Sequence, residues 1–118
     1  MEKTITIVIQ NTPYKIDNKA WHALRFAGAA LATDMNVRVH LLDDGVNVGH
    51  KDQQAPDGTV HLGNLLAELM QVGLTVRACG MAIDGCGIRD GDLFDGIERG
   101  SMRLLADCAK SSDSVLTF

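Results

Sequence analysis

Cys79 is the residue whose type and position could do chemistry. It follows a short apolar run, residues 74–78, and opens a glycine-bearing turn. Open α/β folds place ligands and reactive groups at the carboxyl ends of their strands. If a helix begins directly after Cys79, the free amides of its first turn would favour the thiolate, which attacks sulfur and carbon. The position indicates a reactive thiol, although free cysteine is also among the most buried residue types.

The other two cysteines have different surroundings in the sequence. Cys108 lies on an apolar stripe, which predicts a core position. Cys86 follows Cys79 by seven residues. If residues 79–86 are helical, the two thiols share a face but stand roughly 10 Å apart, too far for a disulfide. If the neighbouring glycines let the segment fold back, the two could form a resolving pair. Both alternatives stay open, and Cys86 is a candidate second thiol.

Motifs for metals and cofactors are missing from the sequence. It contains no C-x-x-C, no H-x-x-x-H and no G-x-x-x-x-G-K-[ST], and no G-x-G-x-x-G follows the first apolar run. We therefore expect no metal and no cofactor. The histidines are scattered and are interpreted as surface residues: His22, His40, His50 and His61. None is expected to act as a base for Cys79.

Composition limits the classes of function. The chain has 118 residues and is expected to form a single domain over residues 1–118. Its net charge is −4 and no segment is a Lys/Arg block, which argues against nucleic-acid binding. No run approaches a membrane span, and the apolar run near the N-terminus is shorter than a secretory signal requires. Three cysteines, an odd number, fit a reducing compartment, so we expect a cytoplasmic protein.

Hydrophobic periodicity predicts alternating strands and helices. The predicted strands span residues 4–9, 36–42, 74–78 and 114–118; the predicted helices span residues 19–33, residues 62–70, and a long segment from Asp92 that carries Phe94, Ile97, Leu104, Leu105 and Cys108 on one side. This β-α-β-α-β-α-β order is typical of a three-layer α/β/α sandwich with a mainly parallel sheet of four to five strands.

Two segments carry further expectations. In residues 36–42, Val37, Val39 and Leu41 alternate with Arg38 and His40, which predicts a strand with one wetter face, at a sheet edge or a subunit contact. Residues 46–59 are polar and contain two glycines. They are interpreted as a mobile loop, with one helical turn near residues 46–50, that could act as a lid over the site.

Four segments together resemble a known family. They are residues 13–25, residues 39–46 (Val-His-Leu-Leu-Asp-Asp-Gly-Val), residues 76–88 around Cys79, and the closing residues 113–118 (Asp-Ser-Val-Leu-Thr-Phe). In order and spacing they resemble the DsrE/DsrF-like family of small sulfur-relay proteins, which includes the TusD-type sulfur carriers. The likeness covers nearly the whole chain.

This resemblance implies a fold, an activity and partners. Members are compact α/β/α sandwiches that assemble into trimers or hexamers, and active members carry sulfur as a persulfide on the cysteine that Cys79 matches. Many members have Arg-Gly where this chain has Cys86-Gly87, which leaves the role of Cys86 open. The expected function is a sulfur carrier or sulfurtransferase with donor and acceptor proteins as partners. The alternatives are a non-catalytic interaction subunit and a small-ligand-binding module.

Overall fold

The computed structural model describes residues 2–14 and 17–118, and for Asp90 its backbone alone. The strands are β1 (Thr4–Ile9), β2 (Asn36–Leu41), β3 (Thr75–Cys79), β4 (Glu98–Gly100) and β5 (Ser114–Thr117). The α-helices are α1 (Lys19–Ala32), α2 (Leu62–Gln71), α3 (Gly80–Gly85) and α4 (Met102–Lys110), and two short 3₁₀ segments are η1 (Asp43–Gly49) and η2 (Asp90–Asp92).

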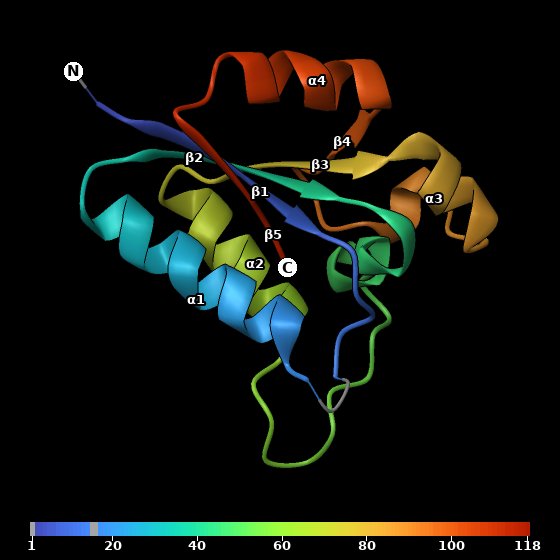
Figure 1. Cartoon of the computed structure of the whole chain (residues 1–118). Helices are drawn as coiled ribbons and strands as arrows, with labels where there is room; N and C mark the ends of the chain where they lie inside the picture. The colour runs from blue at the N-terminus through green and yellow to red at the C-terminus, as the bar shows by residue number, and fades with distance from the viewer. Residues whose placement is uncertain (1, 15–16) are drawn as a thin grey trace.

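The strands form one parallel sheet in the order β4-β3-β2-β1-β5. Helices α1 and α2 cover one face of this sheet and α4 lies over the other, while α3 continues from the end of β3 (Figure 1). The predicted α/β/α sandwich with a parallel sheet is confirmed. Strand β2 lies at the centre of the sheet, so the expectation of an edge position for residues 36–42 is wrong.

The main core lies between the sheet and the α1/α2 layer. Ile7, Ile9 and Leu41 from the strands are fully buried against Leu24 of α1 and Leu66 of α2. Each such side chain contributes about 1.5–3 kcal/mol when it leaves water. Small residues on the buried side of α1 let the helix approach the sheet closely; they are Ala20, Ala23, Ala27 and Ala30. This layer holds the strands in place and thereby fixes their carboxyl ends.

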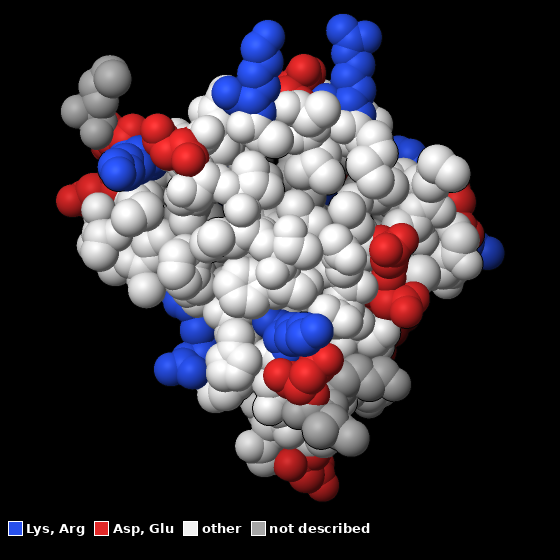
Figure 2. Space-filling model, in the orientation of Figure 1, with Lys and Arg blue, Asp and Glu red and all other residues white. Residues whose placement is uncertain are grey.

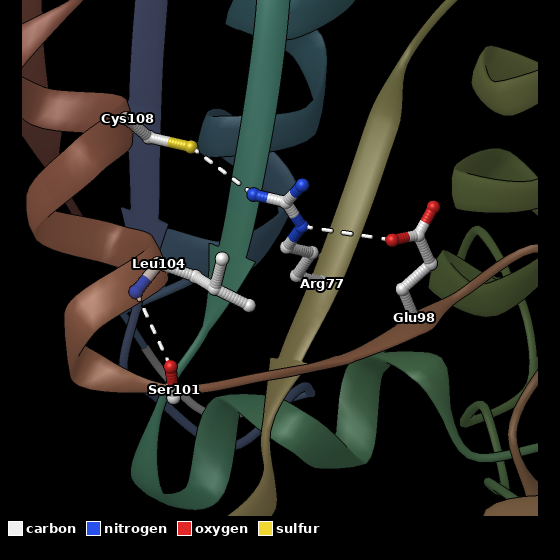
Figure 3. Close-up of polar contacts among 5 residues, drawn as sticks. All are labelled: Arg77, Glu98, Ser101, Leu104 and Cys108. Carbon is white, nitrogen blue, oxygen red and sulfur yellow. Dashed lines mark hydrogen bonds and ion pairs between the residues drawn. The ribbon is translucent and has the colours of Figure 1, made fainter.

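The predicted long helix from Asp92 is wrong. The segment instead contains η2, an irregular stretch, the short strand β4 and then α4. Gly96 adopts a φ of 97°, which no helix accommodates. Ser101 then begins α4 by accepting a hydrogen bond from the amide of Leu104 at 3.2 Å (Figure 3). The apolar residues before β4 lie in an irregular stretch, although their spacing in the sequence matches that of an apolar stripe on a helix.

Residues 43–49 form η1, which confirms the predicted helical turn. The structure does not support a mobile loop over the first part of residues 46–59. Val46 and Val48 are fully buried in the core. Gly45 approaches the end of β1 so closely that a Cβ atom there would lie 2.1 Å from the carbonyl oxygen of Ile9. The first part of the predicted loop therefore belongs to the core. No helix among the described residues is long and apolar enough to cross a bilayer.

Candidate functional site

Cys79 lies where the sequence predicts, at the junction of a strand and a helix. It is the last residue of β3 and the N-cap of α3, with extended backbone dihedrals of φ −60° and ψ 123°. Its side chain is partly exposed. The strand fixes the backbone of this residue from one side and the helix from the other, so the thiol sits on a rigid element and is still accessible to solvent.

Arg99 of β4 holds the turn that follows Cys79. Its guanidinium donates hydrogen bonds to the carbonyl oxygen of Gly80 at 3.2 Å and to Oδ2 of Asp84 at 2.7 Å. The absence of a side chain at Gly80 leaves room for this contact, because a Cβ atom there would lie 2.7 Å from the Nε atom of Arg99 and the guanidinium would have to shift. The interaction ties α3 to β4 and places a positive charge beside the residue next to Cys79.

The sheet register surrounds Cys79 with polar neighbours on the α4 face. Residues that pair side by side in a parallel sheet project to the same face, and residues two apart on a strand share that face. Arg77 pairs with His40 of β2, and Cys79 lies two residues beyond Arg77 on β3. Arg38 is two residues before His40. Two arginines, one histidine and one cysteine therefore occupy neighbouring positions on one face.

His40 is the site residue that sequence reasoning missed. Its exposure is only 2%, and its Nε2 atom has no hydrogen-bond partner among the described residues. Burial lowers the pKa of His40, and the positive charges of Arg77 and Arg38 lower it further. The prediction of a surface histidine is wrong here. The alternation in residues 36–42 identified its face, but burial under α4 depends on tertiary packing that the pattern does not contain.

The other histidines near the predicted loop have structural contacts. His61 is the N-cap of α2, and its Nδ1 accepts a hydrogen bond from the amide of Asn64 at 3.0 Å. His50 forms an isolated antiparallel bridge with Leu93. These contacts assign both histidines a structural role.

Cys108 is a core residue, as predicted. It is 6% exposed on the inner side of α4. Its Sγ atom accepts a hydrogen bond from Nη1 of Arg77 at 3.3 Å, and Nε of Arg77 lies 3.7 Å from Oε2 of Glu98 (Figure 3). Arg77 therefore links β3, β4 and α4, and the helix depends on this polar contact as well as on apolar packing.

Cys86 lies at the opposite end of α3 from Cys79. It is the C-cap of the helix, it is exposed, and its Sγ atom is 4.0 Å from Oδ1 of Asp44. Because the intervening segment is helical, the two thiols are roughly 10 Å apart along the helix axis. The structure thus favours the helical alternative over a folded-back pair, and all three cysteines are free thiols.

The tip of the predicted lid is anchored away from Cys79. Oε1 of Gln53 accepts hydrogen bonds from the Tyr14 hydroxyl at 2.6 Å and the Gly63 amide at 3.1 Å, and its Nε2 donates to the carbonyl of Val48 at 2.7 Å. Figure 1 shows the loop below α1 and α2, apart from α3. Within one chain this segment does not cover the thiol.

A cavity of about 340 Å³ lies between this loop and the start of α1. Tyr14, Trp21 and Val60 contribute its apolar walls, and Asn18 and Lys19 contribute polar groups. Cys79 does not line it. Among the described residues, no group of three His, Cys, Asp or Glu side chains could hold a metal ion.

The chain belongs to the DsrE/DsrF-like family, whose profile matches residues 3–118. It is 37% identical to an uncharacterised protein of Methanopyrus kandleri over 97% of this chain and 93% of that protein. It is 33% identical to protein YchN of Escherichia coli, with 97% of each chain covered. The crystal structure of YchN has a TM-score of 0.89 to this chain, covers all of both chains and shares 32% identity. The resemblance found in the sequence is therefore confirmed.

A methyl group at position 80 tests the contact between Arg99 and α3. We expect Gly80→Ala to displace the guanidinium from Asp84 and, because the end of the arginine side chain can move, to lower the free energy of unfolding by less than about 1 kcal/mol. Urea denaturation measures this change. Gly85→Ala is the matched control, because a Cβ atom at that end of α3 meets no other atom within 4 Å. Equal stability of the two variants would contradict the assigned role of Gly80.

The buried His40 predicts a pH dependence of stability. Its folded-state pKa lies below the ordinary histidine value of 6.5, so the unfolded chain takes up a proton that the folded chain excludes. The free energy of unfolding should therefore fall as pH drops from about 6.5 toward the lower folded pKa, and this group should have no effect above that range. Urea titrations from neutral to mildly acidic pH measure the slope. His40→Gln should reduce it, whereas the exposed His22→Gln should not.

Proposed function

We propose that this protein is a sulfur carrier that holds sulfane sulfur as a persulfide on Cys79 and passes it to a partner protein. The observation that carries the proposal is the partly exposed thiol at the β3–α3 junction of a chain that belongs to the DsrE/DsrF-like family. Sulfur relay needs an accessible thiolate on a rigid support. A cysteine fixed between a strand and a helix has that arrangement.

The transfer is a thiol exchange that needs no external oxidant. The Cys79 thiolate attacks the outer sulfur of a donor persulfide, R–S–SH. A new S–S bond forms on Cys79, the donor S–S bond breaks, and the donor leaves as a thiolate. The reverse chemistry delivers the sulfur to an acceptor thiol. The required partners are a sulfur donor and a sulfur acceptor protein, and the three free cysteines support a reducing compartment such as the cytoplasm.

Cys86 is the candidate second thiol in this scheme. Its exposure makes it accessible to a partner, while its position at the far end of α3 separates it from Cys79. These features support exchange of sulfur with another protein over a disulfide with Cys79 in the same chain.

We further propose a homotrimer or homohexamer. Strand β5 pairs with β1 alone among the described strands. Val115 of β5 is 44% exposed, and Phe26 of α1, whose ring contacts Phe118 directly after this strand, is 43% exposed. Figure 2 shows that the surface over β5 and part of α1 carries few charged side chains. An uncharged edge strand is a site where association would bury apolar surface. In an assembly, the loop of residues 50–60 could lie against the Cys79 of a neighbouring copy.

Cys79→Ala tests the carrier proposal. Incubation of the protein with polysulfide should add the mass of one sulfur atom per chain, and this substitution should abolish the addition. Intact-mass spectrometry under native conditions measures it. Cys86→Ala is the matched control and should still load. Full loading of Cys79→Ala together with loss of loading in Cys86→Ala would contradict the proposal, because Cys86 would then carry the sulfur. No loading of the unmodified protein or of either variant would favour a non-catalytic interaction subunit.

Light scattering tests the assembly. At micromolar concentration we expect a mass of three or six chains, because a small domain with few aromatic residues gains stability by burying its exposed apolar surface. A mass of one 12.7 kDa chain would contradict the proposal.

A further inference from the structure

We propose that His40 is the proton acceptor for the Cys79 thiol. The proposal rests on the proposed function in one respect, namely that the thiolate of Cys79 goes on to attack a persulfide donor. The juxtaposition arises from the pairing of β2 with β3. It assigns a chemical task to a buried imidazole that has no structural partner among the described residues.

The register places the two side chains on one face of adjacent strands. His40 pairs with Arg77, and Cys79 is the next residue of β3 on that face. With strands about 4.8 Å apart and a rise of about 3.3 Å per residue, the two Cα atoms lie roughly 8 Å apart. An imidazole and a thiol on the same face can span that separation by rotating toward each other. Catalytic hydrogen bonds are often long before the substrate binds.

The free nitrogen of His40 needs an explanation. A buried polar atom without a hydrogen bond costs free energy, and buried side chains of this kind usually have a partner. The neighbours that could accept or donate are otherwise engaged: Arg38 binds Ser111, and Arg77 binds Cys108 and pairs with Glu98. The partly exposed thiol of Cys79 is a further proton-bearing group on this face.

The charges around His40 suit a proton that is held briefly. Arg38 on the same strand and Arg77 on β3 disfavour a lasting imidazolium, so the resting imidazole is neutral and can accept a proton. The same two cations favour a nearby sulfur anion. Glu98 of β4 is directed to Arg77, and α4 contributes the Cys108 thiol. Arg77 lies two residues before Cys79 on the same face of β3.

The proposed step balances atoms and electrons. The Nε2 atom of His40 takes the proton from the Cys79 thiol, and the resulting thiolate attacks the outer sulfur of R–S–SH. An S–S bond forms between Sγ of Cys79 and the outer sulfur, and the S–S bond of the donor breaks. The departing thiolate, R–S⁻, takes the proton from His40 and leaves as R–SH. No group is oxidised or reduced overall, and no other reactant is required.

Alkylation kinetics test the proposal without any sulfur donor. The rate of iodoacetamide addition at Cys79 is followed by peptide mass spectrometry across a pH series in the unmodified protein and in His40→Gln. We expect the substitution to slow labelling of Cys79 at neutral pH by roughly tenfold or more and to move its pH profile to higher pH. Cys86, labelled in the same sample, is the internal control and should not change. His22→Gln is the matched histidine variant.

A second measurement remains decisive if His40→Gln does not fold. The imidazole of His40 is titrated by nuclear magnetic resonance in the unmodified protein and in Cys79→Ala. A proton shared between the two groups should shift the midpoint of the His40 titration when the thiol is removed. An unchanged midpoint, or an unchanged Cys79 labelling rate in folded His40→Gln, would overturn the proposal. Failure of sulfur loading with this coupling intact would instead reject only the carrier function.

Discussion

Strand β3 pairs in parallel with β2 on one side and β4 on the other, and this register determines which side chains surround Cys79. A shift by one residue would turn every side chain of a strand to the opposite face. Here the register is fixed by the apolar face: Val76 and Ala78 point into the core with Val39 and Leu41 of β2. The burial of those residues therefore decides that Cys79 and Arg77 lie on the α4 face, beside His40.

The two faces of the sheet differ in polarity. The face under α1 and α2 is apolar and buried. The face under α4 contains His40 and three residues with polar contacts: Thr6 contacts Ser112, Arg38 contacts Ser111, and Arg77 contacts Cys108 and Glu98. Such a face contributes less hydrophobic free energy, because polar groups lose hydration when they are covered. Its charges and its unpaired imidazole nitrogen are features that a reactive site uses, and a purely structural layer would have little use for them.

The sequence correctly predicted the helices and strands whose residues repeat with a regular hydrophobic period. The β-branched run of β1, the stripes of α1 and α2, and the position of Cys79 between a strand and a helix were all correct. The segment after Asp92 was not, since its apolar residues imitate a helical period while Gly96 interrupts the backbone. Periodicity measures spacing alone, and a strand of three residues such as β4 is too short to show one.

The two cysteines of the site could be predicted from local sequence, whereas His40 and Arg99 could not. Cys79 stands out in the sequence because a strand end and glycine residues mark it, and Cys108 because it lies on a stripe. His40 and Arg99 act through strand pairing and through Gly80, and these contacts join positions about 20 to 40 residues apart. His40 is buried in strand β2, and the helix that lies over one face of the sheet, α4, comes from the far end of the chain. No single-sequence pattern connects such positions.

The central claim is that Cys79 carries the sulfur, and direct mapping of a bound persulfide tests it. The unmodified protein is exposed to a sulfane-sulfur donor, its persulfide is trapped by alkylation in the native state, and the modified peptide is located by tandem mass spectrometry. We expect the additional sulfur on the peptide that contains Cys79, with the buried Cys108 unmodified. Sulfur found on Cys86 or Cys108 while Cys79 stays a simple thiol would contradict it.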